Sequence, residues 1–162
     1  MGGGQSGLSA SAQRVQEALE AKGVALKVME LPGSTRTAQE AAHAAGCEIG
    51  QIVKSLIFKG GNSGEAVLVL TSGSNRVDES RVSEELGEPL GLADADFVRE
   101  TTGFAIGGVA PVGHRSEIST YIDEDLMGYE YIWAAAGTPR AIFKLTPDEL
   151  VHITGGKIIT VT

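Results

Sequence analysis

The sequence predicts a single α+β domain built on a mixed β-sheet with short helices around it. Helix-type and strand-type segments alternate along the 162 residues, yet several neighbouring strand segments are joined by short turns. Short turns favour antiparallel pairs, whereas a doubly wound parallel sheet needs a crossover after each strand. The chain also holds 22 glycines, about twice the usual share, which indicates many turns and argues against a helical bundle.

The first part of the domain is expected to contain two helices and a strand. Apolar residues recur at helical spacing over residues 8–19, and Gly23 stops the pattern. Residues 24–31 are expected to form a strand. Thr37 has capping-box spacing to a glutamate three residues later, so a short helix is expected over residues 38–45. Residues 1–7 are expected to be a flexible tail before a domain spanning 8–162.

The middle of the chain contains the best core candidate. Residues 51–58 are rich in β-formers, and the glycine-rich turn 60–64 leads into the apolar run 66–70. A continuous apolar run of this length is typical of a strand buried on both faces. Two short helices are expected next, over residues 78–86 and 94–100.

The last part of the chain is expected to end in three strands and a helix. Residues 129–135 and 140–145 alternate in character like strands joined by the turn 137–139. A second capping box at 146–149, with proline at the first helical position, predicts a helix, and a final strand is expected over 157–161. Three aromatic residues recur at strand spacing in the first of these segments and are expected in the core rather than in a base-stacking platform: Tyr129, Tyr131 and Trp133.

Composition and missing motifs exclude several kinds of chemistry. The single Cys47 cannot form an internal disulfide, and neither a secretory signal nor a run of 18 apolar residues is present, so a cytoplasmic protein without a membrane span is expected. No phosphate-binding loop or nucleophile elbow occurs, although the sequence alone leaves a Ser-His-Asp triad open. The three histidines lack familiar ligand spacing, so neither a metal nor a cofactor is expected. Cys47 is expected to be a packed residue rather than a nucleophile.

Two segments remain as candidate sites. Lys54 lies in an otherwise apolar strand, where an ammonium is costly to bury unless it meets an anion or carbonyl oxygens. The alternative to a binding role is that Lys54 lies on an edge strand and extends its side chain so that the ammonium reaches solvent. Gly107 and Gly108 begin a glycine-rich segment that also holds Pro111 and His114. Adjacent glycines let N–H groups approach a polarised carbonyl, although such loops are often only structural.

In this order and spacing, these segments resemble the YbaK/EbsC family, which is related to the editing domain inserted in bacterial prolyl-tRNA synthetases. The resemblance runs from about Ser11 to Thr162 and implies that family's fold, with a partly barrel-like sheet. Its carriers are Val53-Lys54-Ser55, Gly73-Ser74-Asn75-Arg76-Val77-Asp78, Gly107-x-x-x-Pro111-x-Gly113-His114, Tyr121-Ile122-Asp123 and Leu145-Thr146-Pro147-x-x-Leu150.

The resemblance implies a trans-acting deacylase that hydrolyses the ester of mischarged tRNA, often tRNA(Pro) carrying a small residue. Lys54 would hold the substrate backbone or its terminal phosphate, and Gly107 would present an N–H to the carbonyl. Water would attack with help from a hydroxyl of the terminal ribose, because an activated ester needs mainly positioning and electrostatics. Further substrate-binding candidates are Arg36, Thr37, Arg76, Gly108, Pro111, His114 and Thr138.

Several of these residues also have ordinary structural explanations. Thr37 is a good helix cap, Arg76 can be a solvated charge, and His114 can be a hydrogen-bonded structural histidine. Thr138 stands where some family members carry His or Asn, so the amino acid preference stays open. Asn75 stands where many members carry an acidic residue, and both residue types serve turns.

The expected partner is the acceptor end of an aminoacyl-tRNA, and a prolyl-tRNA synthetase is a candidate second partner. The net charge of −8 is unusual for a nucleic-acid binder and favours brief contact through a few local cations. It also keeps open a non-catalytic module of the same fold that binds tRNA ends, a synthetase or an amino acid. An unrelated hydrolase of small esters is a third alternative. The oligomeric state is not specified by the sequence.

Overall fold

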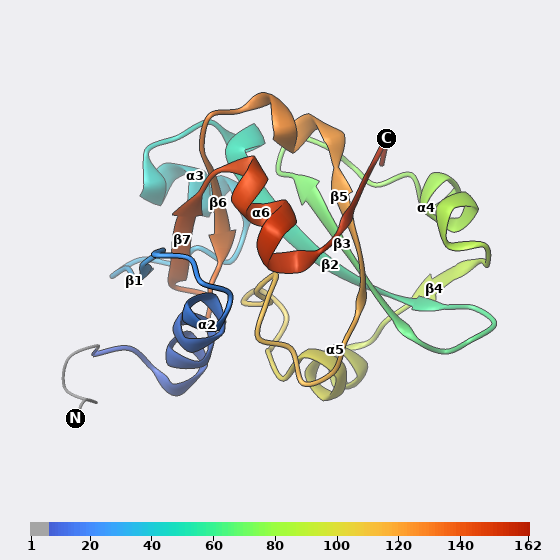
Figure 1. Ribbon diagram of the computed structural model, residues 1–162, viewed down its shortest axis with the longest axis horizontal. Coiled ribbons are helices and arrows are strands. Elements are labelled where there is room, and N and C mark those ends of the chain that lie inside the picture. Colours follow the sequence, from blue (N-terminus) through green and yellow to red (C-terminus); the bar gives the residue numbers. More distant parts are fainter. Residues whose placement is uncertain (1–6) are drawn as a thin grey trace.

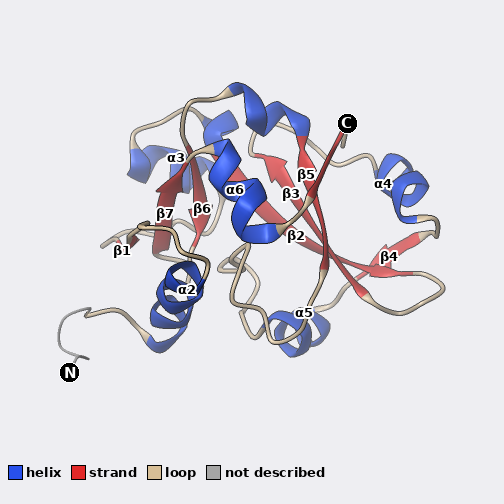
Figure 2. Cartoon of the chain, in the orientation of Figure 1, coloured by secondary structure: helices blue, strands red, loops and turns tan. Residues whose placement is uncertain are grey.

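The structure is a computed structural model, and it describes residues 7–162. The expected tail over residues 1–7 therefore lies, except for its last residue, outside the described residues. The described chain forms the predicted single α+β domain, with helices packed around one mixed sheet (Figures 1 and 2).

The helices are α2 (Ala10–Ala21), α3 (Ala38–Ala45), α4 (Glu79–Leu86), α5 (Ala95–Thr102) and α6 (Pro147–Thr154), with 3-10 turns η1 (Ile49–Gln51) and η2 (Glu124–Gly128). The strands are β1 (Val28–Glu30), β2 (Ile52–Gly60), β3 (Ala66–Ser72), β4 (Leu90–Leu92), β5 (Ser119–Asp123), β6 (Ile132–Ala135), β7 (Ala141–Leu145) and β8 (Lys157–Ile159).

The sheet mixes parallel and antiparallel pairs, as predicted. Its order is β1-β7-β6-β2-β3-β5-β8, and β4 pairs with β2 outside this path. The pairs β2–β6, β3–β5 and β5–β8 are parallel, and the other pairs are antiparallel. Because β1 and β8 end the path, the sheet is open rather than a closed barrel (Figure 2). None of the helices in the described part of the chain is long and apolar enough to cross a membrane.

The β2–β3 hairpin forms the centre of the sheet, and its glycine-rich turn was predicted. Successive side chains of β3 alternate between the two faces and enter two different apolar clusters. Leu68 and Leu70 belong to the main core, whereas Val67 and Val69 pack with Val82 of α4 on the other face. All four apolar residues are buried, so the prediction of a strand covered on both faces is confirmed.

The helix boundaries follow the caps that the sequence contains. The Thr37 hydroxyl accepts the Glu40 N–H and the Glu40 carboxylate accepts the Thr37 N–H, which starts α3 at the expected residue. Gly46 ends α3 in the left-handed conformation, with φ of 70°. Thr146 and Glu149 form the second capping box at the start of α6. The helices expected over 78–86 and 94–100 are also confirmed, as α4 and α5.

Four strands differ from the prediction. The strand expected over 24–31 is only the three residues of β1, the strand expected over 157–161 ends at Ile159, and neither β4 nor β5 was predicted. A three-residue strand has too little sequence pattern to identify it, because its existence depends on a partner far along the chain. β1, for example, pairs with β7 through Met29 and Ile142.

The expectation that all three aromatic residues of the 129–135 segment are core residues was wrong. Tyr131 is 41% exposed, and Tyr129 and Trp133 are only half-buried. Ile132 and Ala134, on the alternate positions, are the buried residues of β6. Tyr131 therefore lies on the exposed face, whereas Tyr129 packs against the main core and Trp133 packs at the edge of the Ala41–Ile52 cluster.

Candidate active site

The site lies at a gap between two strands that pair with the same edge of β2. β6 pairs with β2 only as far as Val53, and β4 begins its pairing at Phe58. Within the described chain, residues 54–57 therefore have no strand partner on this edge. Along an antiparallel strand, the N–H and C=O of alternate residues point to opposite edges. This alternation determines which backbone groups of β2 face the gap.

Two backbone hydrogen bonds fix the direction of that alternation. The Ile52 carbonyl accepts the Gly73 N–H at 2.7 Å, and the Gly60 N–H donates to the Glu65 carbonyl at 2.8 Å. The backbone N–H and C=O groups of even-numbered residues in β2 therefore point toward β3, and those of odd-numbered residues point toward the other edge. The N–H and C=O of Ser55 therefore point into the gap. An extended ligand with its own donor and acceptor can add to this edge as a short strand would.

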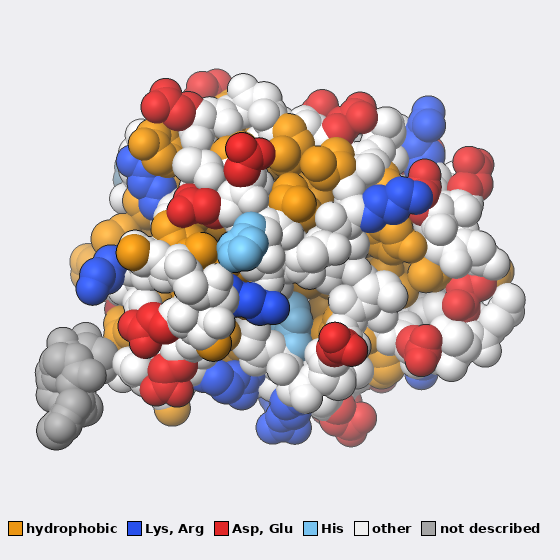
Figure 3. Space-filling model, viewed as in Figure 1, with side chains coloured by type: hydrophobic (Ala, Val, Ile, Leu, Met, Phe, Trp, Pro, Cys, Tyr) orange, Lys and Arg blue, Asp and Glu red, His pale blue; other side chains and the backbone are white. Residues whose placement is uncertain are grey.

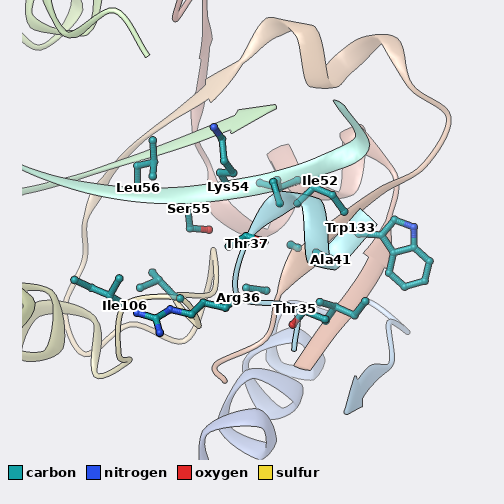
Figure 4. Close-up of a pocket in the computed structure, with 17 residues that line it drawn as sticks. Thr35, Arg36, Thr37, Ala41, Ile52, Lys54, Ser55, Leu56, Ile106 and Trp133 are labelled. Atoms are coloured by element: carbon teal, nitrogen blue, oxygen red, sulfur yellow. The ribbon is translucent and has the colours of Figure 1, made fainter. Parts of the chain in front are cut away.

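A cavity of about 370 Å³ occupies this gap (Figure 4). Its volume falls within the range of roughly 300–1,000 Å³ that is usual for small-molecule sites. Most of its wall is apolar, and no aspartate or glutamate belongs to it. The lining residues are Thr35, Arg36, Thr37, Ala38, Ala41, Ile52, Val53, Lys54, Ser55, Leu56, Ile106, Gly107, Val109, Trp133, Ala134, Ala135 and Ile142.

The structure thus brings four of the predicted site residues to one cavity. Arg36 and Thr37 come from the segment that enters α3, Lys54 comes from β2, and Gly107 comes from the loop after α5. Gly107 has a φ of 94°, and a Cβ placed on it would lie 2.7 Å from the Arg36 Cγ. A glycine is therefore required here both by the backbone and by the close approach of Arg36.

Ser55 contributes a polar group to the cavity that was not predicted from the sequence. Figure 4 shows its side chain on the side of β2 that faces Arg36 and Thr37. Its Oγ is buried and has no hydrogen-bond partner among the described residues. A buried hydroxyl without a partner costs about 1–3 kcal/mol. In the sequence, Ser55 was visible as part of a family motif, and strand alternation implied that it projects from the face opposite Lys54.

Lys54 leaves β2 on the opposite side from Ser55 (Figure 4). Its Nζ donates to the Asn75 carbonyl at 2.8 Å, so the ammonium is half-buried against the turn that follows β3. Burial lowers the pKa of Lys54 below its ordinary 10.5, the charge of Arg76 lowers it further, and Asp123 acts in the opposite direction. The charge of Arg76 therefore favours an anion beside Lys54, whereas the charge of Asp123 opposes one.

Asp123 holds the turn that meets Lys54. Its side chain is 1% exposed, and its Oδ2 accepts bonds from the Thr71 hydroxyl, the Ser72 N–H and the Asn75 side-chain amide at 2.8–2.9 Å. These bonds satisfy the buried carboxylate and fix the position of Asn75. In the sequence, Asp123 is visible only as the last residue of a family motif, and its burial is what identifies its role.

The other predicted site residues lie outside this cavity. Pro111 and His114 line a second cavity of about 370 Å³ next to the end of α6. The His114 Nε2 lies 2.6 Å from the Ala110 carbonyl, and burial is the main cause that lowers its pKa below 6.5. Gly108 packs against the backbone of Thr138, since a Cβ placed on Gly108 would lie 2.8 Å from the Thr138 Cα. These contacts hold the loop that carries Gly107.

Neither thiol chemistry nor a metal site finds support in the described residues. Cys47 is half-buried beside the apolar Ala41–Ile52 contact, and burial raises the pKa of its thiol, which keeps it protonated. Within residues 7–162, no three histidine, cysteine or acidic side chains are close enough to hold a metal ion. Cys47 therefore sits as the packed residue that was expected.

Comparisons with known proteins agree on the kind of domain. The family model of the aminoacyl-tRNA editing domain matches residues 33–153. Protein YwhH of Bacillus subtilis is 29% identical over 131 residues, which cover 81% of this chain and 83% of YwhH. The "Putative Cys-tRNA(Pro)/Cys-tRNA(Cys) deacylase EbsC" of Enterococcus faecalis is 29% identical over 130 residues, covering 78% and 77%. A crystal structure described as a putative trans-editing enzyme for prolyl-tRNA synthetase has a TM-score of 0.91 and 56% identity, covering 96% and 98%.

Proposed function

The chain belongs to the aminoacyl-tRNA editing domain family, and we propose that it hydrolyses the ester of a mischarged tRNA in trans. The proposed substrate is tRNA(Pro) carrying a small residue other than proline. One observation carries this proposal: a single mostly apolar cavity gathers Lys54, Gly107, Arg36 and Thr37 from three separate segments. Its volume of about 370 Å³ is large enough for the aminoacyl group of a small amino acid.

Each wall of the cavity has a part in the proposed reaction. Lys54 and Arg76 receive the terminal phosphate, because their positive charges lie near each other beside the Asn75 turn. The Gly107 N–H stabilises the negative charge that develops on the ester carbonyl oxygen. One such donor contributes roughly 3–4 kcal/mol to a transition state. Arg36 and Thr37 form the wall opposite Ser55 (Figure 4).

The chemical step needs no side-chain nucleophile. A water oxygen attacks the carbonyl carbon, the bond between that carbon and the ribose oxygen breaks, and the ribose oxygen takes a proton. A neighbouring ribose hydroxyl assists the water. Positioning accounts for most of the rate, because the ester is already activated. The loop of Gly107 is held in place by residues that do not touch the aminoacyl group: Gly108, Pro111, His114 and Thr138.

A panel of aminoacyl-tRNAs tests the proposal directly. We expect purified protein to accelerate release of a small amino acid from tRNA(Pro) and to leave Pro-tRNA(Pro) intact, with each rate compared to the uncatalysed rate. Repeating the panel with prolyl-tRNA synthetase tests whether that enzyme is a functional partner. Binding of the tRNA without acceleration of any ester would instead establish the non-catalytic module.

A further inference from the structure

We propose that Ser55 selects the side chain of the aminoacyl group, favouring a residue that carries a hydroxyl over an apolar residue of the same shape. The inference rests on the proposed function, since it concerns the same cavity. It is carried by the hydroxyl of Ser55, which is buried, has no partner among the described residues and belongs to a residue of the cavity wall. Serine and threonine are the amino acids with this chemistry.

The free edge of β2 explains why the substrate side chain meets Ser55. The backbone N–H and C=O of Ser55 point into the gap between β6 and β4. An aminoacyl group has its own amino N–H and carbonyl oxygen, and it can pair with Ser55 as one residue of an added strand. Residues directly opposite each other in a sheet project from the same face. The side chain of the bound amino acid therefore projects from the same face as Ser55.

The other hydroxyl groups of the cavity wall are already used. The Thr35 hydroxyl donates to the Pro139 carbonyl at 3.1 Å. The Thr37 hydroxyl accepts the Glu40 N–H at 3.1 Å as the cap of α3. Among the neutral side chains that line the cavity, Ser55 therefore has the hydroxyl that is left for a ligand. The remaining side chains around the gap are mainly apolar.

The charge of the cavity argues that Ser55 meets a neutral group rather than the substrate's ammonium. No aspartate or glutamate lines the cavity, and Arg36 lies on the same side of β2 as Ser55 (Figure 4). An ammonium at the buried Oγ would lose its hydration without gaining a carboxylate partner. A hydroxyl gains a hydrogen bond there and leaves no charge buried. A valine in the same position would leave the Ser55 hydroxyl unsatisfied.

Threonine and valine provide a matched pair for the test, because they differ by a hydroxyl in place of a methyl group. Both are attached to the same tRNA, and kcat/KM is measured for wild type, Ser55→Ala, Ser55→Thr and Ser63→Ala. Ser63 is an exposed residue of the β2–β3 turn and is the control. In parallel, the dissociation constants of non-hydrolysable threonyl and valyl amides of 3′-amino-3′-deoxyadenosine are measured.

We expect wild type and Ser63→Ala to favour threonine over valine about tenfold, which equals about 1.4 kcal/mol. Ser55→Ala is expected to bring the ratio to about one, and Ser55→Thr is expected to keep the preference. A ratio near one in wild type, or one unchanged in Ser55→Ala, would overturn the role of Ser55. If no ester is hydrolysed but the amides show the expected ratios, only the proposed catalytic function fails.

Discussion

Replacement of Lys54 by alanine tests the residue that the sequence singled out first. The Lys54 ammonium is half-buried, donates to the Asn75 carbonyl at 2.8 Å and lies near enough to Arg76 for the two charges to interact. The fold therefore holds two cations near each other, and a phosphate beside them gains an attraction to both that the charge of Asp123 reduces. A charge pair 4 Å apart near a protein surface is worth about 4 kcal/mol before desolvation. Allowing for that cost, we expect Lys54→Ala to lower kcat/KM by at least about 100-fold, or about 2.7 kcal/mol.

The same substitution should leave the protein folded. It removes one hydrogen bond to Asn75 but also removes the penalty that burial places on the ammonium, so the two effects oppose each other. Lys54→Arg is expected to restore only part of the activity, because the planar guanidinium directs its donors differently. Lys157→Ala is the control, since Lys157 is exposed and paired with Glu85 at 2.8 Å.

The assay is single-turnover deacylation, with a thermal melt of each variant. Turnover close to wild type in a folded Lys54→Ala protein would refute the role of the ammonium. It would leave Lys54 as a structural residue that satisfies the Asn75 carbonyl.

Two further predictions concern the loop that carries Gly107. Gly107→Ala places a side chain on a residue with a φ of 94° and directs its Cβ toward the Arg36 Cγ. We therefore expect the free energy of unfolding to fall by about 1–2 kcal/mol and kcat/KM to fall as well. Gly33 has open space around it, so Gly33→Ala should change neither quantity in thermal melts and rate assays. Equal behaviour of the two variants would contradict the strained turn. Burial lowers the pKa of His114 below 6.5, so the unfolded state binds more protons and the free energy of unfolding should fall as pH drops below about 6.5. His114→Gln should show a smaller fall between pH 7.5 and 5.5 in chemical denaturation, and an unchanged fall would exclude His114 as its source.

The sequence predicted those parts of the fold that local chemistry determines. The capping boxes at Thr37 and Thr146 placed α3 and α6, and the turn after Gly60 placed the central hairpin. The gap beside β2 could not be predicted, because it arises where the pairings with β6 and β4 stop. Ser55 was missed for the same reason. Its importance depends on that missing strand and on the lack of a partner for its hydroxyl.

The acidic composition of the chain and its proposed tRNA substrate are compatible if contact is confined to one end of the RNA. The net charge is −8, and acidic side chains are spread over the face shown in Figure 3, where the described residues form no broad basic patch. Yet the cavity wall includes Arg36 and Lys54 and no carboxylate, and Arg76 lies near Lys54. Phosphates beyond the acceptor end would meet mainly the negative side chains of the protein, which repel them. At physiological salt this repulsion is weak between charges more than about 8 Å apart. The charge distribution therefore favours a substrate that presents its terminal residue and leaves quickly after hydrolysis, and discrimination then depends on the aminoacyl group in the cavity rather than on the body of the tRNA.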